Sequence, residues 1–213
     1  MKIYYFSINN LRIQENYQKA KSLVDADRLL KADKYKNSDD KLRCIGAGLL
    51  IRKIRSDFKI KDKILVDKYG KPYFENNRVY FNISHSGTYV VAAVSEYNVG
   101  IDIQKIVPDI HRVAERNFLP SECEYINRTE VDNERRQRFC EIWTVKESYL
   151  KNIGIGLRKP LNSFEVDLTG TSPQIVGKKE YRFVQVKLAR YYIVAICTDI
   201  KDEEMNVEEV NTF

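Results

Sequence analysis

The 213-residue chain has few cysteines and histidines and no long apolar run. Its four cysteines are scattered without a C-x-x-C pair, which predicts free thiols in a reducing compartment and not a disulfide framework. Two histidines leave too few ligands for a zinc site built from His and Cys. The apolar stretches fall far short of the ~20 residues of a membrane helix, and the first residues show no signal-peptide pattern. We therefore expect a cytoplasmic protein without a membrane partner.

The composition is that of a globular protein with an excess of positive charge. Hydrophobic residues make up 43% and charged residues 31%, and the length suits one large domain or two small ones. Thirty-six Lys and Arg residues against 30 Asp and Glu give a net charge of +6. The tail after Ile200 has one lysine and five acidic residues, so the body before it carries +10. This charge favours an anionic partner: nucleic acid, a phosphorylated small molecule, an acidic protein or a membrane surface.

Hydrophobic periodicity predicts an α+β fold in which helices alternate with short strands joined by hairpin-scale connections. Helices are expected over residues 14–31, 38–55, 110–118 and 135–152, with a further helix capped by Ser121. Strands are expected over residues 2–8, 79–84, 89–95, 100–104, 163–168, 181–186 and 191–197, and a turn over 67–72. No sequence repeat is visible. A boundary near residues 98–100 gives two halves of similar size, 1–98 and 99–213.

The segment Gly100–Gln104 places two oxygen-bearing side chains on one face of a strand. Ile101 and Ile103 alternate with Asp102 and Gln104, so the two apolar residues can enter a core while the two polar ones point to the other side. Oxygen donors of this kind suit a hard cation such as Mg²⁺. An exposed strand face with ordinary polar residues remains the alternative.

The segment 139–151 predicts a buried helix stripe that a charge interrupts. Lys146 falls inside this stripe, and burying an unpaired charge is unfavourable. Glu147 and Lys151 are i, i+4 neighbours, which is also the spacing of a simple surface ion pair. An anionic ligand beside the helix would explain Lys146, whereas the surface pair alone explains the other two residues.

Ser84 and His85 lie where a predicted strand ends in a polar loop. No G-x-S-x-G elbow is present, so a serine hydrolase is not indicated. The two side chains could bind a phosphate, and a loop histidine bonded to nearby backbone is the alternative. Basic residues earlier in the chain are either solvated surface charges or a second phosphate clamp: Arg28, Lys31, Arg43 and Lys71.

In this order, three sequence blocks resemble the 4′-phosphopantetheinyl transferases of the larger, single-chain (Sfp) type. The blocks are Phe81–Gly87, Val99–Ile103, and Trp143–Ser148 followed by Lys151. The turn 70–72, the helix 40–52 and the pair Ser121–Glu122 are also similar to the family's, and the resemblance covers roughly residues 28–160.

The resemblance implies a fold, a reaction and partners. Members of this type fold as two similar α+β halves, a pseudo-dimer with the site in the cleft between them, and we expect a monomer. They transfer the phosphopantetheine arm of coenzyme A to a serine of an apo acyl or peptidyl carrier protein and release adenosine 3′,5′-bisphosphate. Carrier proteins are typically acidic and coenzyme A is a polyanion, which agrees with the positive body of the chain.

The resemblance also implies residue roles. Asp102 and Glu147 would hold Mg²⁺, with Gln104 standing where many relatives carry Glu, and Glu147 would take the proton of the attacking serine. Lys151 would stabilise the pyrophosphate with Lys146, and Glu122 would help the proton transfer. The residues implied for the 3′-phosphate and adenine end are Arg28, Lys31, Arg43, Lys71, Ser84 and His85. Cys44 replaces a threonine that relatives use near the adenine.

The alternative function is a nucleic-acid-binding module. It would use the basic run at residues 52–63 and the 14 tyrosines, and it requires basic and aromatic residues clustered on one surface. Most tyrosines instead lie in apolar patterns typical of a core. A carrier-binding scaffold without catalysis is less favoured, because Asp102, Lys146, Glu147 and Lys151 are all present.

Overall fold

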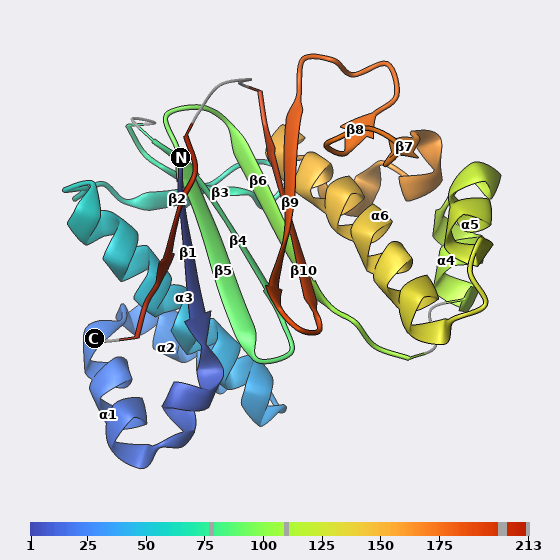
Figure 1. The fold of residues 1–213 in the computed structure, drawn as a ribbon. Helices are drawn as coiled ribbons and strands as arrows, with labels where there is room; N and C mark the ends of the chain where they lie inside the picture. The colour runs from blue at the N-terminus through green and yellow to red at the C-terminus, as the bar shows by residue number, and fades with distance from the viewer. Residues whose placement is uncertain (77–78, 109–110, 200–203, 212–213) are drawn as a thin grey trace.

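A computed structural model describes residues 1–76, 79–108, 111–199 and 204–211, with helices on both sides of a central set of strands (Figure 1). The elements before residue 98 are β1 (Lys2–Ser7), η1 (Ile8–Arg12), α1 (Gln14–Leu23), α2 (Ala26–Asp33), α3 (Ser38–Asp57), β2 (Ile64–Val66), β3 (Pro72–Phe74), β4 (Tyr80–Ser86) and β5 (Tyr89–Ser95). The later elements are β6 (Val99–Lys105), α4 (His111–Asn117), α5 (Pro120–Asn127), α6 (Asp132–Ile153), η2 (Gly156–Arg158), η3 (Leu161–Ser163), β7 (Val166–Asp167), β8 (Gln174–Ile175), β9 (Arg182–Ala189), β10 (Tyr192–Thr198) and β11 (Asn206–Glu209).

The two halves of the chain repeat one topology. In the first, β1 is followed by the long helix α3 and the β4–β5 hairpin; in the second, β6 is followed by the long helix α6 and the β9–β10 hairpin. The strand order is β1-β5-β4 in one sheet and β6-β10-β9 in the other, and all these pairs are antiparallel. This arrangement confirms the predicted α+β fold of two similar halves. The division into domains at residues 98 and 99 stays a prediction.

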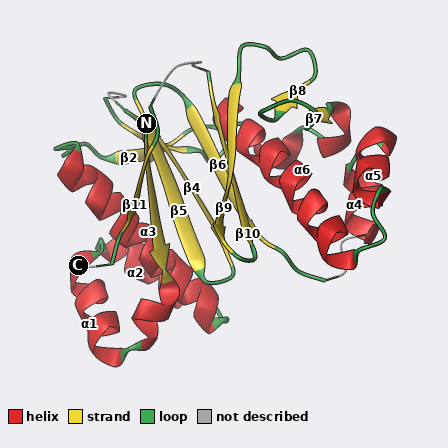
Figure 2. Cartoon of the chain, viewed as in Figure 1, coloured by secondary structure: helices red, strands yellow, loops and turns green. Residues whose placement is uncertain are grey.

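The sheets and helices stack so that the two sheets share a core. Tyr4 and Phe6 of β1 pack with α3, whereas the alternate residues Ile3 and Tyr5 belong to the core that joins the sheets. In the second half, Ile101 of β6 faces that shared core and Ala195 of β10 packs toward α6. Figure 2 shows the strands in the middle with α3 on one side and α6 on the other. The alternation of side chains along each strand therefore decides which layer each residue joins.

The sheets meet at β4 and β6 through side chains. Alternate residues of β4 accept hydrogen bonds from alternate backbone N–H groups of β6, and we call this set the β4–β6 ladder. Its bonds run from Ile101 N to Asn82 Oδ1 (3.0 Å), from Ile103 N to Ser84 Oγ (3.4 Å) and from Lys105 N to Ser86 Oγ (3.0 Å). Backbone donors that would be unsatisfied at a sheet edge are thereby paired.

The expected helix over residues 14–31 is two helices, α1 and α2. Val24 adopts an extended conformation (φ −100°, ψ 153°), and the carbonyl of Asp25 then accepts the N–H groups of Arg28 and Leu29 to begin α2. The helix expected from residue 38 does begin there, but Asn37 caps it by accepting from the N–H groups of the second and third helical residues.

Several short strands were missed by the sequence analysis. β2 and β3 flank the expected turn at residues 67–72, and β11 pairs parallel with β1 within the acidic tail. The strand expected over 163–168 is confined to Val166–Asp167, because residues 161–163 form a 3-10 turn. Residue 110, where a helix was expected to begin, lies outside the described residues. Among the described helices, none combines the length and the apolarity needed to cross a bilayer.

Candidate active site

Asp102 lies on the face of β6 that packs against α6. It is paired with Ala195 of β10, which packs in the core under α6. The close approach of this helix depends on Gly100, on the same face of the strand. A Cβ added at Gly100 would lie 2.0 Å from the carbonyl oxygen of Ser148 and 2.4 Å from the backbone nitrogen of Asn152. Glycine at this position therefore lets the end of α6 approach β6 closely.

Lys151 pairs with Asp102 across the two elements. The Lys151 Nζ lies 2.5 Å from Asp102 Oδ1 and donates to Ser84 Oγ at 2.8 Å. Ser84 in turn donates to the same Asp102 oxygen at 2.8 Å. The structure therefore brings Ser84, Asp102 and Lys151 together, from a strand of the first half and from a strand and a helix of the second. The expected surface pair between Glu147 and Lys151 is not the arrangement found.

Asp102 and Glu147 each carry one buried oxygen that has no partner. These atoms are Asp102 Oδ2 and Glu147 Oε1. Burial, with a further contribution from the negative charge of Asp102, raises the pKa of Glu147 to about 7. Unpartnered carboxylate oxygens that repel one another are the donors that a hard divalent cation takes.

Two carboxylates fit a cation whose remaining ligands come from elsewhere. Among the described residues, no group of three or more His, Cys, Asp or Glu side chains is placed to hold a metal ion. Mg²⁺ commonly binds one or two protein carboxylates and completes its shell with water and substrate phosphates. Gln104 lies on the same strand face as Asp102, with its Nε2 donating to the Lys105 carbonyl at 3.3 Å, and its amide oxygen is a further candidate ligand.

His85 and Arg43 form a second polar group at the far end of β4. His85 is exposed and lies on the opposite face of β4 from Ser84, so these two neighbours do not form one clamp. Arg43 of α3 donates to the Gly87 carbonyl at 2.6 Å and pairs with Asp40 at 2.6 Å. Partial desolvation of the imidazole by surrounding protein atoms lowers the pKa of His85, and the positive charges of Arg43 and Lys151 lower it further. Positive charge therefore extends from Arg43 to Lys151 along this edge.

The predicted residues Arg28 and Lys31 lie on α2, which packs against α3. The Arg28 carbonyl accepts a weak bond from Cys44 Sγ at 3.7 Å, so Arg28 lies beside the residue that follows Arg43. Lys31 is exposed one turn further along α2. The Arg28 side chain lies against α3 at Gly48, so α2 and α3 carry these basic residues on the first half of the chain.

The structure does not bring Lys146 and Glu122 to this site. Lys146 is fully buried, and its three N–H groups go to the carbonyls of Leu161 (2.7 Å) and Phe164 (2.6 Å) and to Glu122 Oε1 (2.7 Å). The other Glu122 oxygen accepts the N–H of Leu119 at 2.9 Å. Lys146 thus has no N–H left for a ligand, and Glu122 has no free oxygen for a proton. The charge that interrupts the apolar stripe is neutralised inside the protein.

Lys71 also lies away from Arg43 and His85. Its Nζ donates to Asn98 Oδ1 (2.8 Å) and to the carbonyl of Asn152 at the end of α6 (2.7 Å), and lies 3.4 Å from the Val99 carbonyl. Burial lowers the pKa of Lys71 to about 8. Val99 is about 10 Å along β6 from Asp102, so Lys71 joins the first residue of β6 to the C-terminal end of α6.

Two of the six basic residues at positions 52–63 are paired within the fold, and the other four are exposed. Lys53 pairs with Asp57 and with Glu208 of β11, both at 2.9 Å, and Arg55 donates to the Asp62 carbonyl at 3.0 Å. These contacts hold α3 to its neighbours. They give no support to a nucleic-acid surface.

The sequence analysis missed several residues that position the elements of the site but have no role in the reaction themselves. Gly100 sets the helix–strand distance, Asn82 holds β6 to β4, and Asn152 accepts from Lys71 while its Nδ2 donates to the Asn98 and Cys197 carbonyls. A signal was present for Asn82, because polar residues at positions 82, 84 and 86 alternate along a strand otherwise expected to be buried.

Comparison with known proteins places both halves in one family. The model of the 4′-phosphopantetheinyl transferase superfamily matches residues 98–197, and the model described as 4′-phosphopantetheinyl transferase, N-terminal, matches residues 12–97. A solved structure, holo-[acyl-carrier-protein] synthase of Thermotoga maritima, matches with 20% identity and a TM-score of 0.40, over 47% of this chain and 61% of that one.

Curated relatives match over most of the chain. 4′-Phosphopantetheinyl transferase gsp of Aneurinibacillus migulanus is 37% identical over 69% of this chain and 64% of its own length. 4′-Phosphopantetheinyl transferase Sfp of Bacillus subtilis (strain 168) is 33% identical over 79% of this chain and 77% of its own length. These matches confirm the resemblance drawn from the three sequence blocks. The chain therefore belongs to the 4′-phosphopantetheinyl transferase superfamily.

Proposed function

We propose that this chain transfers the 4′-phosphopantetheine arm of coenzyme A to a serine hydroxyl of an apo acyl or peptidyl carrier protein and releases adenosine 3′,5′-bisphosphate. Membership of the transferase family supports the reaction. The observation that carries it for this chain is the pair of buried, unpartnered carboxylate oxygens on Asp102 and Glu147, next to the ammonium group of Lys151.

Asp102 and Glu147 would hold Mg²⁺, with the amide oxygen of Gln104 as a further ligand. Their free oxygens are the support for this assignment. A bound Mg²⁺ supplies positive charge that stabilises the charge developing on the leaving phosphate.

Glu147 is suited to accept the proton of the attacking serine. Its carboxylate is largely buried beside Asp102 and Lys151, and its unpartnered oxygen can accept a proton from a hydroxyl brought next to it. The serine oxygen forms a bond to the phosphorus that carries the pantetheine arm, while the bond from that phosphorus to the bridging oxygen breaks. The hydroxyl proton goes to Glu147, and the bond's electron pair leaves with adenosine 3′,5′-bisphosphate.

Lys151 is placed to bind the pyrophosphate. Its ammonium is held between Ser84 and Asp102 and remains one-quarter exposed, so it can meet an incoming phosphate without leaving its partners. Arg43 and His85, with Arg28 and Lys31 of the adjoining helix α2, would take the 3′-phosphate end. Charge-assisted hydrogen bonds to phosphate in a partly desolvated cleft are stronger than neutral ones.

The expected partners and location follow from charge and thiol chemistry. A body with net charge +10 favours an acidic carrier protein. The four cysteines are all unpaired, which supports a cytoplasmic location. We propose that the enzyme works as a monomer, since one chain already contains both halves of the repeated fold.

The test combines the protein, coenzyme A, Mg²⁺ and an apo carrier domain, and weighs the carrier by mass spectrometry. The expected result is a gain of one phosphopantetheine, with a rate loss of about 10²–10⁴-fold for Glu147→Gln. Exposed Glu124 on α5 offers a matched control, and Glu124→Gln should keep the wild-type rate. No mass gain with the wild-type protein would refute the reaction, and a full rate for Glu147→Gln would refute the role of that residue.

A further inference from the structure

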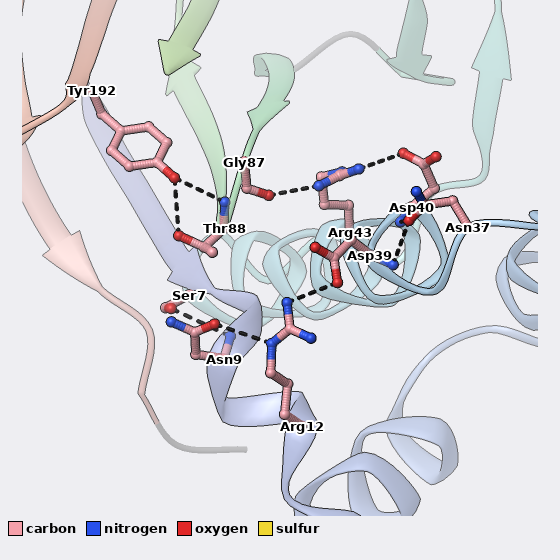
Figure 3. Close-up of polar contacts among 10 residues, drawn as sticks. All are labelled: Ser7, Asn9, Arg12, Asn37, Asp39, Asp40, Arg43, Gly87, Thr88 and Tyr192. Atoms are coloured by element: carbon pink, nitrogen blue, oxygen red, sulfur yellow. Dashed lines mark hydrogen bonds and ion pairs between the residues drawn. The ribbon is translucent and has the colours of Figure 1, made fainter. Parts of the chain in front are cut away.

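One peptide group ties the first half of the chain to the second. The carbonyl of Gly87 accepts from Arg43 Nη1 at 2.6 Å, and the N–H of Thr88, in the same peptide group, donates to Tyr192 Oη at 3.0 Å (Figure 3). Carbonyl and N–H point in opposite directions across a trans peptide. Arg43 of α3 and Tyr192 of β10 therefore bond opposite edges of the same planar peptide group.

Tyr192 is fitted closely to this turn. The hydroxyl also lies 3.1 Å from Thr88 Oγ1, and the ring packs edge-on against Tyr89 with centroids 4.8 Å apart. Gly87 has φ +53°, and a Cβ there would lie 2.3 Å from Tyr192 Oη. The residue is only 6% exposed, so its hydroxyl depends on these partners. Hydroxyl, turn and ring form a single packed unit.

The position of Arg43 depends on this unit. Its guanidinium is anchored by two groups, the Asp40 carboxylate on its own helix and the Gly87 carbonyl on the turn. Only the second of these links it to β4, the strand that carries Ser84 and His85. A rotation of the Gly87–Thr88 peptide would break this link and leave the guanidinium held by α3 alone.

We propose that Tyr192 is a positioning residue for the 3′-phosphate of coenzyme A, acting through the Gly87–Thr88 peptide on Arg43. This inference rests on the proposed function, which places the 3′-phosphate end of the substrate at Arg43. The hydroxyl of Tyr192 contacts Thr88, and its ring contacts Tyr89. Its effect is therefore confined to the end of the substrate that carries the extra phosphate.

The test compares coenzyme A with 3′-dephospho-coenzyme A as substrates of the wild-type enzyme and of Tyr192→Phe. The variant keeps the ring and removes the hydroxyl. We expect KM for coenzyme A to rise about 5-fold, the effect of one lost hydrogen bond. KM for 3′-dephospho-coenzyme A and kcat with either substrate should stay at wild-type values. In calorimetric titrations without carrier protein, Tyr192→Phe should likewise raise the Kd of coenzyme A and leave the Kd of 3′-dephospho-coenzyme A unchanged.

Two further variants sharpen the result. Thr88→Val removes the contact between the Thr88 and Tyr192 hydroxyls but keeps the hydrogen bond from the Thr88 N–H to Tyr192 Oη. The rise in KM for coenzyme A should therefore be smaller than in Tyr192→Phe. Tyr5→Phe is the matched control, because Tyr5 donates to exposed Glu209 on the far edge of the sheet. In an Arg43→Gln background, Tyr192→Phe should have no further effect on KM for coenzyme A, because the two residues act in series.

An equal rise in KM for both substrates would show general loosening of the fold and would overturn the proposal. So would an unchanged KM for coenzyme A in Tyr192→Phe, or full additivity with Arg43→Gln. Failure of the wild-type protein to load a carrier with either compound refutes the proposed function instead. The carrier-free titrations separate the two failures.

Discussion

Lys151 lies 2.5 Å from Asp102, whereas Glu147, four residues earlier on the same helix, has a buried oxygen without any hydrogen-bond partner. The Lys151 ammonium is thus paired with Asp102, whereas the charge of Lys151 offsets the burial of the Glu147 carboxylate only in part. This burial, together with the negative charge of Asp102, raises the pKa of Glu147 to about 7. It also makes the site a source of instability that a bound cation would relieve.

The stability of the metal-free protein should depend on pH through Glu147. Its pKa is about 7 in the folded chain against an ordinary 4.5, so folding favours the protonated form. Its contribution to the free energy of unfolding is therefore largest below pH 4.5 and falls by about 3 kcal/mol as the pH rises to 7. Thermal unfolding in the presence of a chelator, compared between wild-type and Glu147→Gln, should show this difference, with the variant more stable at pH 8. A variant less stable than wild-type at pH 8 would contradict the predicted penalty.

Gln104→Glu should strengthen Mg²⁺ binding. The new carboxylate lies on the same strand face as Asp102 and adds a negative ligand to the site. We expect the Mg²⁺ concentration for half-maximal transfer to fall several-fold, measured by titrating Mg²⁺ at fixed coenzyme A. Gln174→Glu, at an exposed position on β8, makes the same charge change away from the site and should have no effect. An unchanged Mg²⁺ dependence for Gln104→Glu would exclude residue 104 as a ligand.

Gly100→Ala should separate α6 from β6. The added Cβ would lie 2.0 Å from a backbone carbonyl of the helix, and backbone cannot move aside as a flexible side chain can. We expect destabilisation of about 3 kcal/mol or more and a loss of kcat in the fraction that remains folded. Urea unfolding and transfer assays on the same sample measure both. Gly170→Ala, whose Cβ would meet only ordinary contacts at 3.6 Å, should change neither quantity.

Lys146→Met should affect stability and not the pH profile or the substrate affinity. Removing the lysine leaves the Glu122 carboxylate buried without its charge partner, which is expected to destabilise the fold by about 3–5 kcal/mol. Chemical denaturation measures this loss. The surface pair Lys41–Asp33 supplies a control, and Lys41→Met should leave the stability close to that of the wild type. A large rise in KM for coenzyme A in folded Lys146→Met would instead show that Lys146 contributes to substrate binding.

The sequence predicted the parts of the site that depend on local periodicity. The alternation along β6 correctly separated Asp102 from Ile101 and Ile103, and the helical period correctly placed Lys146 on a buried stripe. It could not identify the partner of Lys146, because Glu122 lies 24 positions earlier in the sequence on another helix. Contacts between distant elements are set by tertiary packing, which a local pattern does not contain.

The same reason explains the other differences. The sequence analysis predicted no strand in the acidic tail, yet β11 pairs with β1, and Glu208 forms an ion pair with Lys53. Ser84 and His85 are adjacent in sequence but lie on opposite faces of β4, so proximity along the chain was misleading for a strand. The break between α1 and α2 depends on the extended backbone of Val24, a residue with no helix-breaking chemistry of its own.

The β4–β6 ladder makes the junction of the two halves asymmetric, because its side-chain acceptors all come from β4 and its backbone donors all come from β6. By topology, β9 is the counterpart of β4, yet the side chains of β9 that pack against the shared core include Val184 and Leu188, which carry no acceptor. Two copies of the second half could not satisfy the N–H groups of β6 at such a junction. The two lobes are therefore not interchangeable, although they share one topology. The amide and hydroxyl groups of β4 make the first lobe a specific partner for the second.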